Sequence, residues 1–170
     1  KGRELADQLG QELSAVIIAA ETNFDPADLG NYGADRVILC QHKFLDTYST
    51  EGYTQALSAV IASEMPSVVL YGATPHGRDL APRVAARLRL GLTADCTRLS
   101  IDDDGQLVQT RPAFGGNIMA SIITPHTRPQ TATVRPNVFP ALEPDPSRLA
   151  EVFEFPLTMS RAAIRTRLVQ

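Results

Sequence analysis

The segment with the clearest potential for ligand binding follows a short apolar run at residues 68–71. Gly72 and the hydroxyl residue Thr74 lead from this run to Gly77 and the cation Arg78. In open α/β sheets, ligands bind beyond the carboxyl ends of strands, where helix N-termini present free N–H groups to anions. The segment therefore predicts either a phosphate-binding turn or an ordinary tight turn between a strand and a helix. It contains no G-x-G-x-x-G pattern and no P-loop lysine, so both interpretations stay open.

A proline constrains where the helix after this turn begins. Proline inside a helix removes a backbone hydrogen bond and kinks the axis, so Pro82 is expected in the first turn. That places the helix start near residues 78–79, with Asp79 as the capping residue. If Gly72 or Gly77 needs a positive φ, a β-branched substitution there is expected to destabilise the fold.

A second segment of chemical interest joins two predicted strands. It contains Arg111, the aromatic Phe114, the pair Gly115 and Gly116, and the amide Asn117. Two consecutive glycines permit close backbone approach and unusual φ and ψ angles. Arg111 and Asn117 could therefore face a partner or a nucleotide. The alternative is a β-bulge or a hairpin turn that binds nothing.

Other reactive side chains form no recognisable catalytic or metal-binding pattern. His42, His76 and His126 lack the spacing of metal ligands, and the acidic run 102–104 is typical of a solvated turn. No G-x-S-x-G elbow is present, so a hydrolase has no nucleophile–base pair to support it. We therefore predict no catalytic residue and no metal site.

Composition and charge indicate one ordinary folded domain. The chain has 170 residues, 44% of them hydrophobic, and a net charge of −3. Such a charge predicts neither a nucleic-acid partner nor attraction to an anionic membrane. No run reaches the ~18 apolar residues of a membrane helix, so we expect a protein that is not membrane-embedded. Cys40 and Cys96 are predicted to be free and buried, which favours the cytoplasm or an organelle matrix.

The elements that must position these segments alternate along the first half of the chain. Continuous apolar runs predict strands buried on both faces, which is typical of a parallel sheet covered by helices. The predicted architecture is an α/β fold with a doubly wound, mostly parallel sheet. The predicted helices lie at 3–13, 51–64 and from about 78 to 90 with Gly91 as the stop, and the strands at 15–19, 37–40 and 68–71.

The second half of the chain has a different pattern. Residues 99–110 predict a β-hairpin around an Asp-Gly turn, and residues 117–124 and 131–135 are further strand candidates. We expect these strands to extend the sheet edge in antiparallel fashion. From Pro136 the chain is rich in proline, which favours an arm or linker, with one more short strand expected at 164–169.

Four stretches in order resemble one known family. Their sequence is similar to the N-terminal domain of the electron transfer flavoprotein alpha subunit, in the superfamily of adenine-nucleotide alpha-hydrolase-like domains. The resemblance implies a scaffold and interface domain of a heterodimeric electron carrier rather than an enzyme. The stretches are 72–88, 91–96, 110–120 and 128–136.

The resemblance also implies cofactors and partners. The alpha subunit pairs with a beta subunit, which holds AMP or a second FAD. FAD of the alpha subunit lies in its C-terminal domain, so no residue of this chain is expected to bind it. Electrons pass from dehydrogenases, typically the acyl-CoA dehydrogenases of fatty acid beta-oxidation, to a downstream acceptor such as a quinone reductase.

These expectations divide the chain into two parts. Residues 1–139 are predicted to form the α/β domain, and residues 140–170 a proline-rich arm toward the FAD-binding domain. Because a helix of a parallel sheet normally follows a strand, the first strand of the domain is expected before Lys1. The alternative hypothesis is a small AMP- or ATP-binding module that uses the turn at 72–78.

Overall fold

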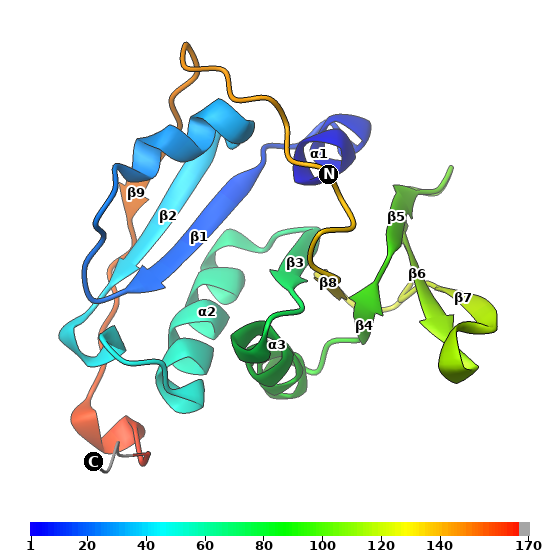
Figure 1. The fold of residues 1–170 in the computed structure, drawn as a ribbon. Coiled ribbons are helices and arrows are strands. Elements are labelled where there is room, and N and C mark those ends of the chain that lie inside the picture. Colours follow the sequence, from blue (N-terminus) through cyan, green and yellow to red (C-terminus); the bar gives the residue numbers. More distant parts are fainter. Residues whose placement is uncertain (167–170) are drawn as a thin grey trace.

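The computed structural model describes residues 1–166 and contains three small sheets (Figure 1). Two are parallel, with strand orders β1-β2-β9 and β3-β8-β4, and the third, β5-β6-β7, is antiparallel. The predicted α/β class is confirmed. The strands are β1 Ser14–Ala19, β2 Arg36–Gln41, β3 Val68–Gly72, β4 Leu92–Cys96, β5 Arg98–Ile101, β6 Leu107–Ala113, β7 Ile118–Ile122, β8 Gln130–Val134 and β9 Glu151–Glu154.

The helices lie between the strands much as their apolar periodicity predicts. Ser49 caps the second α-helix by accepting a hydrogen bond from the N–H of Gly52, and Met65 ends that helix in the left-handed conformation. The elements are α1 Gly2–Leu9, α2 Thr50–Glu64 and α3 Pro75–Leu88, with short 3-10 helices η1 Pro26–Tyr32, η2 Lys43–Leu45, η3 Phe114–Gly116 and η4 Arg161–Ala163. None of the described helices is long and apolar enough to cross a membrane.

The core between α2, α3 and the parallel strands positions the turn at residues 72–78. Leu57 and Ile61 of α2 pack with Tyr71 of β3 and with Leu80 and Val84 of α3. Burial of such side chains is worth roughly 1.5–3 kcal/mol each, so this cluster fixes the end of β3 against the start of α3.

The strand at Gln130–Val134 corrects one sequence prediction. It was expected as an antiparallel strand at the sheet edge, but β8 lies between β3 and β4 and is parallel to both. Its polar residues are compatible with burial because their side chains are hydrogen-bonded inside the fold. Thr131 donates to the carbonyl of Gly91, and the Thr133 hydroxyl accepts from the N–H of Asp95.

The predicted hairpin is present but forms a separate sheet. Gly105 has a φ of 72°, and the Asp102 carboxylate accepts from two backbone N–H groups of the turn. A buried glutamine ties this sheet to the parallel strands, because Gln130 Oε1 accepts a hydrogen bond of 2.7 Å from the N–H of Leu107. The antiparallel sheet therefore projects from the core, and the hydrogen bond between Leu107 and Gln130 holds it there.

The segment after Pro136 contributes a strand that was not predicted from the sequence. β9 pairs in parallel with β2, and Met159 and Ile164 then pack against Leu45. The helix α3 also ends differently, because Arg89 rather than Gly91 adopts the left-handed conformation. The strand expected at 164–169 is not seen at 164–166, and residues 167–170 lie outside the described part of the chain.

Candidate functional site

The turn before α3 differs from its predicted form. The prediction that the helix begins at residues 78–79 with Asp79 as cap is wrong: α3 begins at Pro75, and Thr74 is its cap. The Thr74 hydroxyl accepts a hydrogen bond of 3.1 Å from the N–H of Gly77. Pro75 suits the first helical position, whose N–H has no partner inside the helix. Pro82 therefore lies in the helix interior, where the packing of α3 on the core outweighs the lost hydrogen bond.

The two glycines of this turn play different roles. A β-carbon on Gly77 would overlap the carbonyl oxygen of Gly72, whereas a β-carbon on Gly72 would make an ordinary contact of 3.6 Å with Thr74. Neither glycine has a positive φ. Gly77 is thus needed for close backbone approach, and the end of β3 packs directly on the first turn of α3.

Arg78 is held by the protein rather than free for a ligand. Its Nε donates to the carbonyl of Ala73 at 2.8 Å, and its Nη2 contacts an Asp95 carboxylate oxygen at 2.9 Å. The other carboxylate oxygen of Asp95 contacts Arg135 at 2.6 Å. The hydrogen bond from Arg135, with further support from Arg78, holds the pKa of Asp95 below its usual value. A phosphate at this turn would have to compete with a carboxylate already in place.

A polar cluster that was not predicted joins the starts of α2 and α3. The Tyr48 hydroxyl donates to the Asp79 carboxylate at 2.7 Å, and the Thr50 hydroxyl donates to the same oxygen. The Tyr48 ring also stacks on His76, with centroids 4.2 Å apart. Burial and the Asp79 carboxylate raise the pKa of Tyr48 to about 12. Since Tyr48 and Asp79 are distant in sequence, no local spacing could have revealed this cluster.

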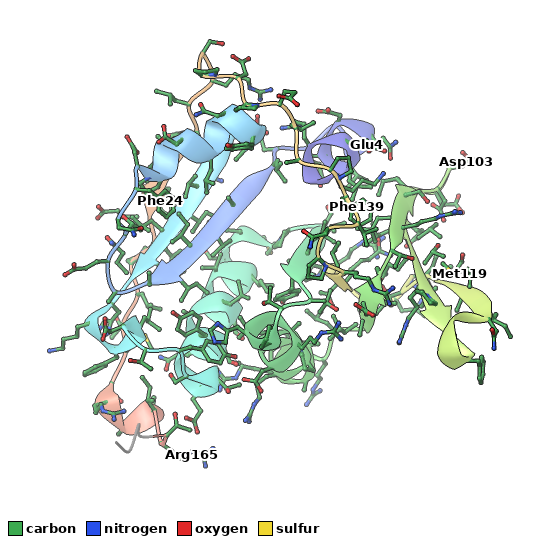
Figure 2. All side chains as sticks on the ribbon, in the orientation of Figure 1. Glu4, Phe24, Asp103, Met119, Phe139 and Arg165 are labelled. Carbon is green, nitrogen blue, oxygen red and sulfur yellow. The ribbon has the colours of Figure 1, made fainter. Side chains whose placement is uncertain are left out.

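The second predicted segment forms the exposed tip between β6 and β7. Phe114 is 81% exposed with a φ of 48°, and Gly115 and Gly116 also have positive φ values. Ile118 and Met119 are exposed beside it, and Figure 2 shows Met119 at the outer end of the antiparallel sheet, away from the parallel sheets. We call this apolar surface of Phe114, Ile118 and Met119 the β6–β7 tip.

The polar residues of that segment lie beside the tip. Asn117 is exposed, and Arg111 is partly buried with an Nε that has no hydrogen-bond partner among the described residues. No hydrogen bond or ion pair in residues 1–166 links this segment to the turn at 72–78. Among the described residues, the structure therefore shows no direct polar contact between the two predicted segments.

Metal and thiol chemistry receive no support from the arrangement of side chains. Within residues 1–166, no group of three His, Cys, Asp or Glu side chains could hold a metal ion. Cys40 and Cys96 are free and buried, as expected, and burial raises the pKa of each thiol to about 11. A thiol with such a pKa is a poor nucleophile near neutral pH.

Comparison with known proteins shows similarity to one family along nearly the whole chain. Residues 1–160 match the family model of the electron transfer flavoprotein domain. The chain is 47% identical over 169 residues to the electron transfer flavoprotein subunit alpha of Thermoanaerobacterium thermosaccharolyticum, covering 99% of this chain and 51% of that protein. It is 41% identical to protein FixB of Clostridium saccharobutylicum, covering 100% of this chain and 51% of that protein.

A further relative has a name that refers to one enzyme. The acryloyl-CoA reductase electron transfer subunit beta of Anaerotignum propionicum is 44% identical over 166 residues, covering 84% of this chain and 45% of that protein. The chain thus spans about half the length of the curated relatives that it matches.

Proposed function

The chain belongs to the electron transfer flavoprotein family, and on that premise we propose that it forms the N-terminal scaffold and interface domain of an alpha subunit. In this proposal the domain holds a beta subunit so that a flavin bound elsewhere in the complex can accept and donate electrons. The observation that carries the proposal is the match over nearly the whole chain to relatives named as alpha subunits.

The turn at the start of α3 offers a poor fit to a flavin or nucleotide phosphate. Gly77 packs on the backbone of Gly72, Thr74 caps the helix, and Arg78 is bound by Asp95. We therefore assign no redox step to the described residues. FAD is proposed to lie in the C-terminal domain of the whole subunit, and AMP or a second FAD in the beta subunit.

The enzyme partner is proposed to be one that oxidises CoA thioesters and gives the electrons to the carrier, or one that reduces CoA thioesters and takes electrons from it. The printed name of one relative, an electron transfer subunit of acryloyl-CoA reductase, supports this class of partner. Acyl-CoA dehydrogenases of fatty acid beta-oxidation are the donors that the resemblance implies, with a quinone reductase or another protein as acceptor. The bacterial cytoplasm or an organelle matrix remains the proposed location.

The β6–β7 tip is the surface that we assign to the beta subunit. Exposed apolar side chains that gather on a projecting element are typical of protein interfaces, because exposing them to water is unfavourable and burying them against a partner is favourable. Phe114 has the size and exposure of an interface anchor, and the hydrogen bond from Leu107 to Gln130 holds its sheet on the core. Gly115 and Gly116 would let the backbone of the partner approach closely.

A binding experiment with a matched control tests this assignment. The variants are Phe114→Asp and Met65→Asp, because both residues are 81% exposed and both have a φ close to 48°. Met65 ends α2 and lies outside the β6–β7 tip. With the beta subunit immobilised, we expect Phe114→Asp to weaken binding at least about tenfold and Met65→Asp to leave it unchanged. Equal affinities for both variants would remove the tip from the interface, and no binding by the unmodified chain would refute the scaffold role.

The alternative, a small AMP- or ATP-binding module, is not favoured by any contact in the described residues. It requires Arg78 to leave Asp95 and Ala73 when nucleotide binds. Calorimetric titration of the chain with AMP or ATP tests this hypothesis directly.

A further inference from the structure

Arg111 of β6 is a partly buried cation for which residues 1–166 supply no counter-charge. Its Nε is shielded from solvent without a hydrogen-bond partner, and none of the ion pairs in this part of the chain involves its guanidinium. Removing an arginine from water is costly unless hydrogen bonds and an opposite charge compensate for the loss. The described residues therefore leave this side chain without the partners that a partly buried arginine needs.

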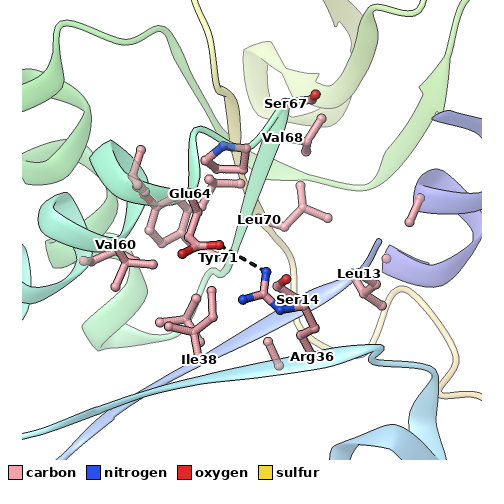
Figure 3. Close-up of a pocket in the computed structure, with 18 of the residues that line it drawn as sticks. Leu13, Ser14, Arg36, Ile38, Val60, Glu64, Ser67, Val68, Leu70 and Tyr71 are labelled. Atoms are coloured by element: carbon pink, nitrogen blue, oxygen red, sulfur yellow. Dashed lines mark hydrogen bonds and ion pairs between the residues drawn. The ribbon is translucent and has the colours of Figure 1, made fainter. Parts of the chain in front are cut away.

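The other partly buried arginines in residues 1–166 each have a carboxylate partner. Arg3 contacts Asp35 at 2.5 Å. Arg36 of β2 contacts Glu64 of α2 at 3.2 Å, as Figure 3 shows. The remaining arginines of this part of the chain are exposed, so water solvates their charge. Arg111 is thus the exception, being neither exposed nor paired with a carboxylate.

The register of the antiparallel sheet places Arg111 beside the β6–β7 tip. Arg111 lies opposite Ala120 of β7, and the next pair on the same face joins Ala113 to the tip. The residue opposite Ala113 is Ile118, which is 54% exposed. The two alanines are too short to cover a long side chain. Arg111 therefore shares one face of the sheet with the exposed Ile118 and can be reached from that side.

Two polar side chains near Arg111 cannot supply the missing negative charge. Burial raises the pKa of the Cys96 thiol to about 11, and the positive charge of Arg111 opposes this rise. A thiol with such a pKa is neutral near pH 7. Gln109 lies two residues earlier on the same face of β6 and is a neutral amide. Even a hydrogen bond from Arg111 to Gln109 would leave the charge of the guanidinium uncompensated.

Arg111 is also the only charged residue of β6, β7 and the turn between them. Residues 107–123 contain no lysine, histidine, aspartate or glutamate. The tip residues Phe114, Ile118 and Met119 are apolar and each at least half exposed. A partner that covers these apolar side chains would also remove water from the guanidinium, so it must bring a negatively charged acceptor.

We propose that a carboxylate of the beta subunit, from an aspartate or glutamate side chain, pairs with Arg111 when the β6–β7 tip is covered in the heterodimer. The planar guanidinium offers parallel N–H groups that match both oxygens of a carboxylate. Phe114 and Ile118 supply apolar contact area, and Arg111 discriminates against partners without a carboxylate. The inference rests on the proposed function, because it requires the tip to be the beta-subunit interface.

Other occupants fit this surface less well. A second copy of the chain that docked tip to tip would bring another Arg111 and no carboxylate from residues 107–123, so like charges would meet. A free phosphate ion would pair with the guanidinium but would gain nothing from the exposed Phe114 and Ile118. A protein carboxylate set among apolar side chains matches both the charge and its surroundings.

Two properties of an Arg111→Met variant test the proposal together. The polypeptide that contains these residues is expressed in full from its gene and measured alone and against the immobilised beta subunit. Alone, we expect an equal or higher melting temperature, because methionine removes an unpaired charge. Against the beta subunit, we expect binding to weaken at least about 30-fold. A lower melting temperature with unchanged affinity would assign Arg111 to the fold and overturn the proposal.

A neighbouring arginine supplies the matched control. Arg98 of β5 is exposed and lies opposite Thr110, so it belongs to the other face of the sheet from Arg111. We expect Arg98→Met to change the affinity less than about threefold. An equal loss in both methionine variants would indicate a general attraction of positive charge and refute the pairing. Arg111→Lys keeps the charge, so it should bind more tightly than Arg111→Met; equal affinities of these two variants would contradict the proposal.

A double-mutant cycle identifies the partner group. Each aspartate and glutamate of the beta subunit is replaced by asparagine or glutamine. One replacement should weaken binding to the natural polypeptide and have little effect on binding to Arg111→Met. If no acidic residue of the beta subunit were coupled in this way, the proposal would be wrong. Binding of AMP or inorganic phosphate that Arg111→Met abolished would assign the arginine to a phosphate and overturn it as well.

These measurements separate this inference from the proposed function. If Phe114→Asp weakens binding and Arg111→Met does not, the tip remains the interface and only the carboxylate pairing fails. If Phe114→Asp binds as tightly as the natural polypeptide, the tip is not the interface, and the pairing fails with it. If the natural polypeptide does not bind the beta subunit, the scaffold role and the pairing are both refuted.

Discussion

A β-carbon placed on Gly77 would overlap the carbonyl oxygen of Gly72, so the end of β3 and the first turn of α3 meet backbone to backbone. From the sequence, substitution of Gly72 or Gly77 is expected to destabilise the fold if either residue needs a positive φ. Neither has one. What the turn requires is the absence of a side chain at Gly77.

The two glycines should therefore respond differently to alanine. We expect Gly77→Ala to lower the free energy of unfolding by roughly 1–3 kcal/mol, because the backbone must shift to relieve the overlap. Gly72→Ala should change it by less than about 0.5 kcal/mol, since its β-carbon meets Thr74 at 3.6 Å. Urea denaturation of both variants measures the difference. Equal midpoints would show that the turn is not tightly packed.

The second prediction concerns Asp95, which has a φ of 62° and bridges Arg78 and Arg135. Asn tolerates this backbone conformation, so Asp95→Asn removes the charge without adding strain. Both arginines are about half exposed, and water screens their attraction. We therefore expect a loss of only about 0.5 kcal/mol at neutral pH, measured by urea denaturation.

The same variant has a predictable pH dependence. Arg135 and Arg78 hold the pKa of folded Asp95 below its ordinary value of 3.8. The ionised group therefore stabilises the fold above the unfolded pKa, and this contribution disappears as the pH falls from about 4 through the folded pKa. The stability difference between the natural chain and Asp95→Asn should be constant above about pH 5 and shrink below pH 4. A difference that grows on acidification would contradict the ion-pair geometry.

The features that could be predicted from the sequence are those with a local cause. Apolar runs predicted β1, β2 and β3 because buried parallel strands need apolar side chains on both faces. β8 was misplaced because its threonines and glutamine are satisfied by hydrogen bonds to distant residues, which no local pattern records.

Among the candidate sites, some features likewise have a local cause, whereas others depend on contacts between distant residues. The exposed tip at Phe114 follows from its own glycines, whose left-handed conformations turn the chain between β6 and β7. The binding of Arg78 by Asp95, and of Asp79 by Tyr48, depends on tertiary packing and could be found only in the folded chain.

The third prediction tests how the antiparallel sheet is anchored. Gln130 is 1% exposed, its Oε1 accepts from Leu107, and its Nε2 donates to Gln106 at 3.0 Å. Gln130→Met keeps the approximate shape but leaves a buried N–H without a partner, which costs about 1–3 kcal/mol. We expect a lower melting temperature and faster amide exchange at Leu107.

An exposed hydrogen bond in the same sheet supplies the control. The hydroxyls of Thr110 and Ser121 are 3.1 Å apart on the surface. Thr110→Val should change stability by less than about 0.5 kcal/mol, because water replaces the lost bond. If the two variants melted alike, Gln130 would not be the anchor.

The last prediction concerns nucleotide binding at the turn before α3. Because Arg78 is bound by Asp95 and Ala73, we expect calorimetric titration of the chain with AMP or ATP to give no binding heat. Asp95→Asn releases one of these contacts, yet the packing of Gly77 on Gly72 remains, so this variant should not bind either. Binding by the natural chain that is lost in Arg78→Ala would instead support the nucleotide-binding module. Binding by Asp95→Asn alone would show that the carboxylate, rather than the closed turn, keeps phosphate out.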